Sequence, residues 1–274
     1  MNGAFIWLLS IGSIALAIVV FAMLTAACEI GFFVGRWRSR RAPPDDHDQA
    51  MVATLSAGML SLLAFILGLS VSYAQGRFEA RRDLVVTEAN AVGTAWLRAR
   101  AVASPEGDAV AAGIRKYAAT RLAFTIAERD GPVEALNEQT AEEEAVIWAH
   151  VREAARQQPS PITATMISAV NEMIDSAQSQ RFAFLGDPPG AMFDMMIAGS
   201  LLAIGALGYE MGLRGRRQLV LTGLLLMMWT GAIVITFDLS RPRIGEARPD
   251  PRPLEWTIHD IDTWGRGQLA SPQS

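Results

Sequence analysis

The sequence predicts an all-α integral membrane protein, with four transmembrane helices in two hairpins that flank a helical extramembrane domain. The first observation is compositional: the 274 residues are 51% hydrophobic and only 19% charged, with a mean hydropathy of +0.23, whereas soluble domains carry roughly a quarter charged residues. The second is the presence of four apolar stretches, each close to the roughly 20 residues that a membrane span requires. The third is the lack of strand patterns, because no sustained alternation and no Asn-Gly turn between strand-like runs occurs.

The four expected spans cover residues 5–27, 52–74, 191–209 and 219–237. A short polar linker joins the first to the second, and only a few residues join the third to the fourth, so each pair forms a hairpin. The first span is an anchor rather than a cleaved signal peptide, because no Lys or Arg precedes it and its apolar run exceeds the usual length of about 7–15 residues. The chain thus divides into a first transmembrane helix with an Arg-rich loop (1–51), a second helix (52–75), the helical domain (76–190), a hairpin of helices three and four (191–237) and a Pro/Arg-rich tail (238–274).

The central domain is expected to consist of helices. The first continues from the second span to about residue 103, and Ser104 and Ser160, each followed by Pro, are typical caps of the helices that follow. Gly131-Pro132 ends the helix between these caps and precedes an acidic helix. The tail, with Pro242, Pro249, Pro251 and Pro253 in its first part, is interpreted as an irregular segment that packs on the domain through Leu254 and Trp256.

Arginines in the short loops predict the orientation. They are Arg36, Arg38, Arg40 and Arg41 after the first span, and Arg214, Arg216 and Arg217 between the third and fourth. Because cytoplasmic loops carry an excess of Lys and Arg, both loops are expected in the cytoplasm. The N-terminus, the helical domain and the tail then lie on the outer face. The arginines at 77, 81 and 82, directly after the second span, weigh against this orientation.

Nothing in the sequence supports an enzyme. The net charge of −4 argues against general nucleic-acid binding, and the single cysteine, Cys28, excludes a disulfide framework. The three histidines lie far apart and near no carboxylate at ligand spacing, and phosphate-binding loops and nucleophile motifs are missing. We therefore expect neither catalytic residues, nor a cofactor, nor a metal site.

Small residues mark one face of the second span. Ser61, Phe65, Gly68 and Ser72, with Gly58 before them, recur at spacings of three and four and so share a helix face. One interpretation is close helix packing, which small residues permit in lipid. The spacing by itself favours this interpretation. The alternative is a pore-facing surface, where the hydroxyls meet water and Phe65 forms an apolar constriction.

Two further glycine pairs, at positions 31 and 35 and at positions 208 and 212, predict dense packing between helices or subunits. Acidic residues near the span ends are expected to have structural roles, such as an ion pair between Glu210 and Arg214 one helical turn apart.

A charged segment follows the second span. Its polar residues are Arg77, Glu79, Arg81, Arg82, Glu88, Asn90 and Arg98. One interpretation is a solvated helix with intrahelical ion pairs, each worth a few tenths of a kcal/mol. The other is a buried polar network, or an electrostatic ring if the helix lines an oligomer axis. The spacing by itself favours the solvated helix.

This segment, RFEARRDLVVTEANAVGTAWLR, resembles the signature of a bestrophin-like family of bacterial membrane proteins, catalogued as a domain of unknown function. A second block, with Asn171, Glu172, Asp175 and Arg181, is similar to that family's second signature. A third, Asp238-Leu239-Ser240-Arg241-Pro242, resembles the segment after its last span. The chain departs from the family pattern at Ser240, where an acidic residue is more usual, and at Ser176-Ala177, where a Leu-His pair is usual.

The resemblance implies a homo-oligomer, pentameric by analogy, in the bacterial plasma (inner) membrane, that passes small anions such as chloride. The second span would line the pore through the Ser61–Ser72 face, with Arg77, Arg81 and Arg82 raising the anion concentration at its mouth. It also implies a cytoplasmic helical domain, which conflicts with the arginine distribution. The competing hypothesis is a membrane-anchored sensor or scaffold whose helical domain binds a partner.

Overall fold

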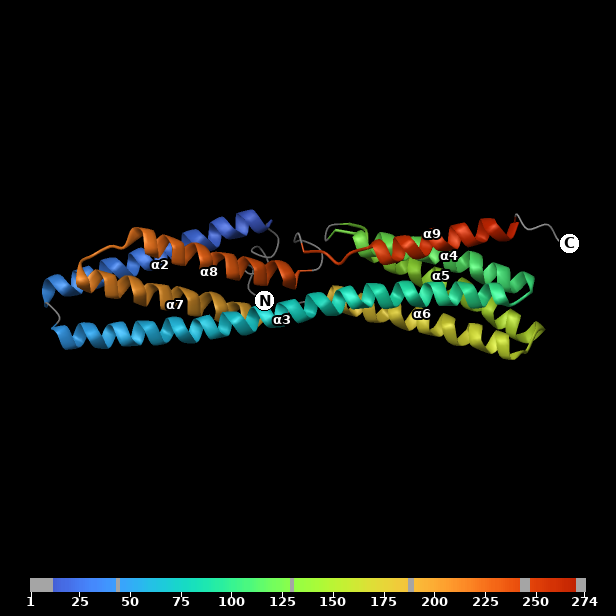
Figure 1. Ribbon diagram of the computed structural model, residues 1–274, viewed down its shortest axis with the longest axis horizontal. Helices are drawn as coiled ribbons and strands as arrows, with labels where there is room; N and C mark the ends of the chain where they lie inside the picture. Colours follow the sequence, from blue (N-terminus) through green and yellow to red (C-terminus); the bar gives the residue numbers. More distant parts are fainter. Residues whose placement is uncertain (1–11, 43–44, 129–130, 187–189, 242–246, 270–274) are drawn as a thin grey trace. The chain divides into compact units, whose positions relative to one another are not determined.

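The computed structural model describes residues 12–42, 45–128, 131–186, 190–241 and 247–269. Every regular element in these ranges is an α-helix, which confirms the predicted all-α class. The helices are α2 (Ser13–Arg41), α3 (Asp46–Ala101), α4 (Pro105–Ile126), α5 (Val133–Gln157), α6 (Pro161–Leu185), α7 (Gly190–Arg214), α8 (Leu219–Ser240) and α9 (Arg252–Leu269) (Figure 1).

Four helical stretches among these residues are long and apolar enough to cross a membrane, as the sequence predicts. They are α2, the first part of α3, α7 and α8, which together form one compact unit, here called the membrane bundle. The helices α7 and α8 both pack against α2 in this bundle (Figure 1). The arginines at 36, 38, 40 and 41, expected in a loop, instead extend α2 to its last turn, where cations interact favourably with the helix dipole.

Glycines bring α2 and α7 into backbone contact. A Cβ added at Gly31 would overlap the carbonyl oxygen of Gly205, and one added at Gly208 would overlap that of Cys28. Gly35 and Gly212 lie equally close to the facing backbone one turn further on. The predicted dense packing at both glycine pairs is therefore confirmed, and the contact is made within one chain.

The second unit, here called the helical domain, comprises α3 from Phe78 onward together with α4, α5, α6 and α9. The two predicted caps are present: the Ser104 hydroxyl accepts a hydrogen bond from the Gly107 amide and the Ser160 hydroxyl one from the Thr163 amide, each at 3.1 Å. Buried side chains of α3, α4, α5, α6 and α9 form its main apolar core, and a smaller cluster consists of Val85, Ala89, Phe124, Phe184 and Leu254.

The tail is not irregular, because α9 occupies much of it. The Asp250 side chain accepts a hydrogen bond from the Arg252 amide at 3.0 Å, and Pro253 falls in the first turn, where its missing N–H costs nothing. Leu254 and Ile261 are buried, at the spacing of an amphipathic helix. The prolines therefore mark a helix start. Leu254 packs into the domain as expected, whereas Trp256 is 61% exposed.

Candidate functional site

The predicted small-residue face of α3 points away from the other helices of the membrane bundle. Ser61, Phe65, Gly68 and Ser72 are all exposed, Phe65 to 63% of its surface. A Cβ added at Gly68 would meet no atom within 4 Å. We call these four residues the α3 stripe. Within the part of the chain that the structure describes, the stripe packs against no helix, so its small residues do not serve packing inside one subunit.

The opposite face of α3 holds the helix in the bundle. Leu63 and Leu67 are buried in the same apolar core as residues of α2, α7 and α8. The Ser56 hydroxyl donates a hydrogen bond to the Ala206 carbonyl of α7 at 3.4 Å. This packing fixes the rotation of α3 about its axis, and with it the direction of the stripe.

The charged segment after the span divides into two sets by burial. Arg77, Glu79, Arg82 and Asn90 are exposed or half-buried, and Arg77 donates a hydrogen bond to the Tyr73 hydroxyl at 3.4 Å. Arg81, in contrast, is only 1% exposed. This burial does not support the expectation that Arg81 attracts anions at a pore mouth, because its side chain is not open to solvent in the subunit.

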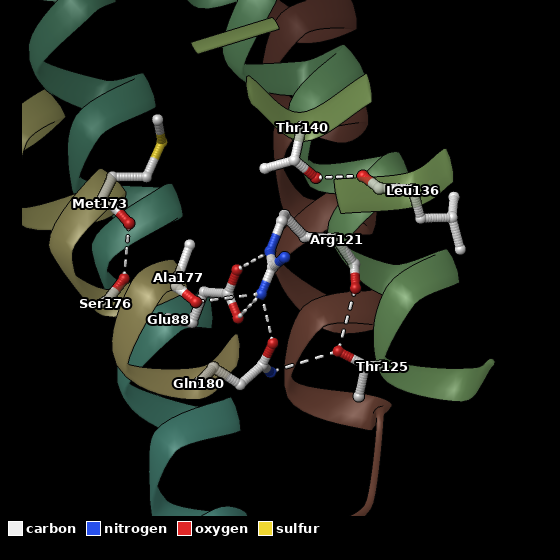
Figure 2. Close-up of polar contacts among 9 residues, drawn as sticks. All are labelled: Glu88, Arg121, Thr125, Leu136, Thr140, Met173, Ser176, Ala177 and Gln180. Atoms are coloured by element: carbon white, nitrogen blue, oxygen red, sulfur yellow. Dashed lines mark hydrogen bonds and ion pairs between the residues drawn. The ribbon is translucent and has the colours of Figure 1, made fainter. Parts of the chain in front are cut away.

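Glu88 is fully buried and belongs to a polar network inside the helical domain (Figure 2). Arg121 of α4 donates from Nε to one Glu88 carboxylate oxygen at 2.5 Å and from Nη2 to the other at 3.4 Å. The same Nη2 donates to the Gln180 side-chain oxygen of α6 at 2.5 Å, and the Gln180 amide donates to the Thr125 hydroxyl at 3.2 Å. The network joins α3, α4 and α6, so the second interpretation of the segment is correct for Glu88.

Residues of the second predicted block lie on the outer side of α6. Asn171, Glu172 and Asp175 are exposed. Arg181 is half-exposed, and one of its nitrogens lies 3.8 Å from a Glu134 carboxylate oxygen. Arg98 of the first block reaches α6 from α3 by donating to the Thr165 carbonyl at 3.1 Å. This contact joins α3 to α6 at Thr165, which lies before the second block.

Beside the buried network lies a cavity of about 600 Å³, lined by α4, α5 and α6. Arg121 and Arg181 contribute the positive charges, and Glu144 of α5 contributes a carboxylate. Burial raises the pKa of Glu144, and the nearby Glu88 raises it further, against the opposing effect of Arg121 and Arg181. Asn137, Thr140 and Gln178 contribute uncharged polar side chains to the lining.

Sequence reasoning missed Arg121, Gln180, Asn137 and Glu144. A buried Arg in an otherwise apolar helical pattern was the available signal, since an unpaired buried charge is costly and implies an acidic partner. Among the described residues, no three His, Cys, Asp or Glu side chains lie close enough to hold a metal ion. The Nδ1 atom of His150 lies 2.7 Å from a Glu106 carboxylate oxygen.

These features define an integral membrane protein with a membrane bundle and a helical domain. The chain belongs to the bestrophin-like family, because the family model of the Bestrophin-like domain matches residues 21–254. No curated protein matches the chain.

Solved structures share the fold. A mutant of a bacterial bestrophin homologue from Klebsiella pneumoniae is similar with a TM-score of 0.65 and 15% identity, over 93% of this chain and 99% of that chain. A second mutant of that homologue gives a TM-score of 0.64 and 13% identity, over 90% and 96%. A structure described as a membrane protein gives 0.61 and 17%, over 94% and 99%. The family match confirms the predicted resemblance, and the solved structures show that the fold is shared.

Proposed function

We propose that this protein is one subunit of an oligomeric anion channel, in which the α3 stripe lines the pore. Family and fold support a channel of the bestrophin type in general. The observation that carries the finer proposal is the outward direction of the stripe. A surface in contact with lipid is expected to be uniformly apolar, whereas the stripe presents two hydroxyls and a glycine around one aromatic ring.

Each residue of the stripe has a distinct part in permeation. The hydroxyls of Ser61 and Ser72 donate hydrogen bonds to a partly dehydrated anion, and the ring of Phe65 between them narrows the apolar section. Arg77 follows Ser72 on the same helix, and its positive charge raises the anion concentration at that end of the pore. Five copies around an axis, by analogy with the family, would close the pathway.

We further propose an inner-membrane location with both arginine-rich ends in the cytoplasm and the helical domain on the outer face. Arg217, between α7 and α8, lies 3.0 Å from the Glu29 carboxylate of α2 and stacks over the ring of Phe32. Gly215 adjoins the side chain of Arg36. The two sets of arginines therefore gather at one end of the bundle, as the positive-inside rule requires of a pair of cytoplasmic loops.

Current across a planar bilayer that contains the purified full-length protein, in asymmetric chloride, tests the channel. Discrete steps that reverse near the chloride potential are expected. Phe65→Ala should raise the unitary conductance, and Met228→Ala, which removes an apolar side chain 75% exposed on α8, should leave it unchanged. Arg77→Glu should lower the preference for anions.

A silent bilayer, with the protein shown to be folded and inserted, would refute the channel and favour the sensor or scaffold hypothesis. Conductance that responds equally to Phe65→Ala and Met228→Ala would refute the assignment of the α3 stripe to the pore but would leave the channel itself standing.

A further inference from the structure

The cavity of the helical domain has the features of a ligand site. Its volume of about 600 Å³ falls within the range of small-molecule pockets, which is roughly 300–1,000 Å³. It is lined by three helices, with Arg121 from α4, Asn137, Thr140 and Glu144 from α5, and Arg181 from α6 among the contributors. The site lies wholly within the helical domain and is separate from the α3 stripe.

Asn137 is the strongest indication of a missing partner. Its side chain lines the cavity and is only 5% exposed, yet neither its amide nitrogen nor its carbonyl oxygen forms a hydrogen bond among the described residues. Nearly all buried polar groups in native proteins are hydrogen-bonded, because an unsatisfied one has lost its water without compensation. Asn137 therefore offers one donor group and one acceptor to whatever occupies the cavity.

Arg121 offers a second donor. Its Nε and Nη2 are held by Glu88, Gln180 and the Ala177 carbonyl, whereas its Nη1 forms no hydrogen bond within the described part of the chain (Figure 2). These four hydrogen bonds hold the guanidinium rigidly while leaving one amino group unused. A preorganised donor of this kind binds a carboxylate at little entropic cost.

Glu144 supplies the opposite charge. It is not engaged by any hydrogen bond or ion pair to the residues that the structure describes, and its pKa is raised mainly by burial. A cation in the cavity would restore the interactions that its carboxylate lacks. The cavity therefore presents donors and positive charge from Arg121 and Arg181 together with an unsatisfied carboxylate from Glu144.

We propose that this cavity binds a small zwitterion of the free amino acid class. The ligand carboxylate accepts hydrogen bonds from Arg121 Nη1 and the Asn137 amide and faces Arg181, and its ammonium group donates to Glu144 and to the Asn137 carbonyl. An inorganic anion or a plain carboxylate satisfies the donors but is repelled by Glu144. A plain ammonium satisfies Glu144 but is repelled by the two arginines.

Isothermal titration of the full-length protein in detergent at neutral pH tests the proposal. The probes are the twenty standard amino acids, with acetate and methylammonium as separate halves of the zwitterion. At least one amino acid should bind saturably, and each half should bind at least about a hundredfold more weakly, because it loses one charged contact and meets a like charge.

Two variants separate binding from structure. Asn137→Leu removes polar atoms that have no partner among the described residues, so it should leave thermal stability unchanged or raised while weakening the binding of the amino acid at least about tenfold. Glu144→Gln should reduce the preference for the amino acid over acetate. Glu142→Gln, at an exposed position of the same helix, is the matched control and should change neither.

Three outcomes would overturn the proposal. Absence of binding for every amino acid removes the ligand class, and acetate binding as tightly as any amino acid makes the cavity a simple anion site. Loss of stability or of the oligomer in Asn137→Leu means that the amide meets a neighbouring subunit instead. None of these outcomes depends on whether the protein conducts, so the proposed channel is judged separately.

Discussion

The ion pair between Arg121 and Glu88 should be one of the strongest single determinants of stability in the helical domain. Their side chains are 1% and 0% exposed, so Arg121→Met leaves the Glu88 carboxylate buried without its counter-charge. Breaking a buried pair from one side costs about 3–5 kcal/mol. At roughly 2–4 °C per kcal/mol for a domain of this size, the unfolding temperature should fall by about 10 °C.

The double variant Glu88→Leu with Arg121→Met should recover most of this loss. Replacing both partners of a buried pair by apolar residues is often neutral or stabilising, since neither charge is then left without water. Recovery should remain incomplete, because the Gln180 side-chain oxygen loses its donor while its amide still binds Thr125. An unsatisfied buried acceptor costs about 1–3 kcal/mol.

Thermal unfolding of the detergent-solubilised protein, followed by tryptophan fluorescence, measures these changes, since Trp96 lies in the core of the same domain. Arg156→Met is the control, because its 3.6 Å pair with Glu153 is exposed to 75% and 42% and should contribute less than about 1 kcal/mol. Equal shifts for Arg121→Met and Arg156→Met would refute the reasoning, as would a double variant less stable than Arg121→Met alone.

Three further predictions follow from other parts of the chain. Gly208→Leu should separate α7 from α2, because even a Cβ at this position overlaps the Cys28 carbonyl. The variant should therefore give less folded protein in size-exclusion chromatography, whereas Gly223→Leu, with open space at the position of its Cβ, should give an unchanged yield. Because the pKa of Glu144 is raised in the folded state, ionisation of its carboxyl should reduce stability as the pH rises above about 4.5. Glu144→Gln should abolish that part of the decline in unfolding temperature, and a pH profile of the variant identical to that of the unmodified protein would contradict this prediction. A cysteine at Ser179, in a background that lacks the native thiol, should react with an impermeant maleimide on intact cells if the helical domain is external; labelling only after lysis would reverse the proposed orientation.

The membrane bundle could be predicted because its determinants are local and long. An apolar run of about 20 residues specifies a span whatever surrounds it, and small residues one turn apart mark where backbones approach. The ends of elements were less predictable. Arginines that suggested a loop extend α2, and prolines that suggested an irregular tail begin α9, because Asp250 and Pro253 act as a helix start rather than as breakers.

The polar interior of the helical domain could not be predicted, because its partners come from distant positions. Glu88 and Arg121 are 33 residues apart, and Arg121 and Gln180 are 59 apart, so no local pattern connects them. The family signature contains Glu88 but not its counter-charge. The charged residues of the signature are therefore of two kinds: residues such as Arg77, which is partly exposed, and residues such as Arg81 and Glu88, which are buried. Charge reversal distinguishes them, since it should alter selectivity in the first kind and stability in the second.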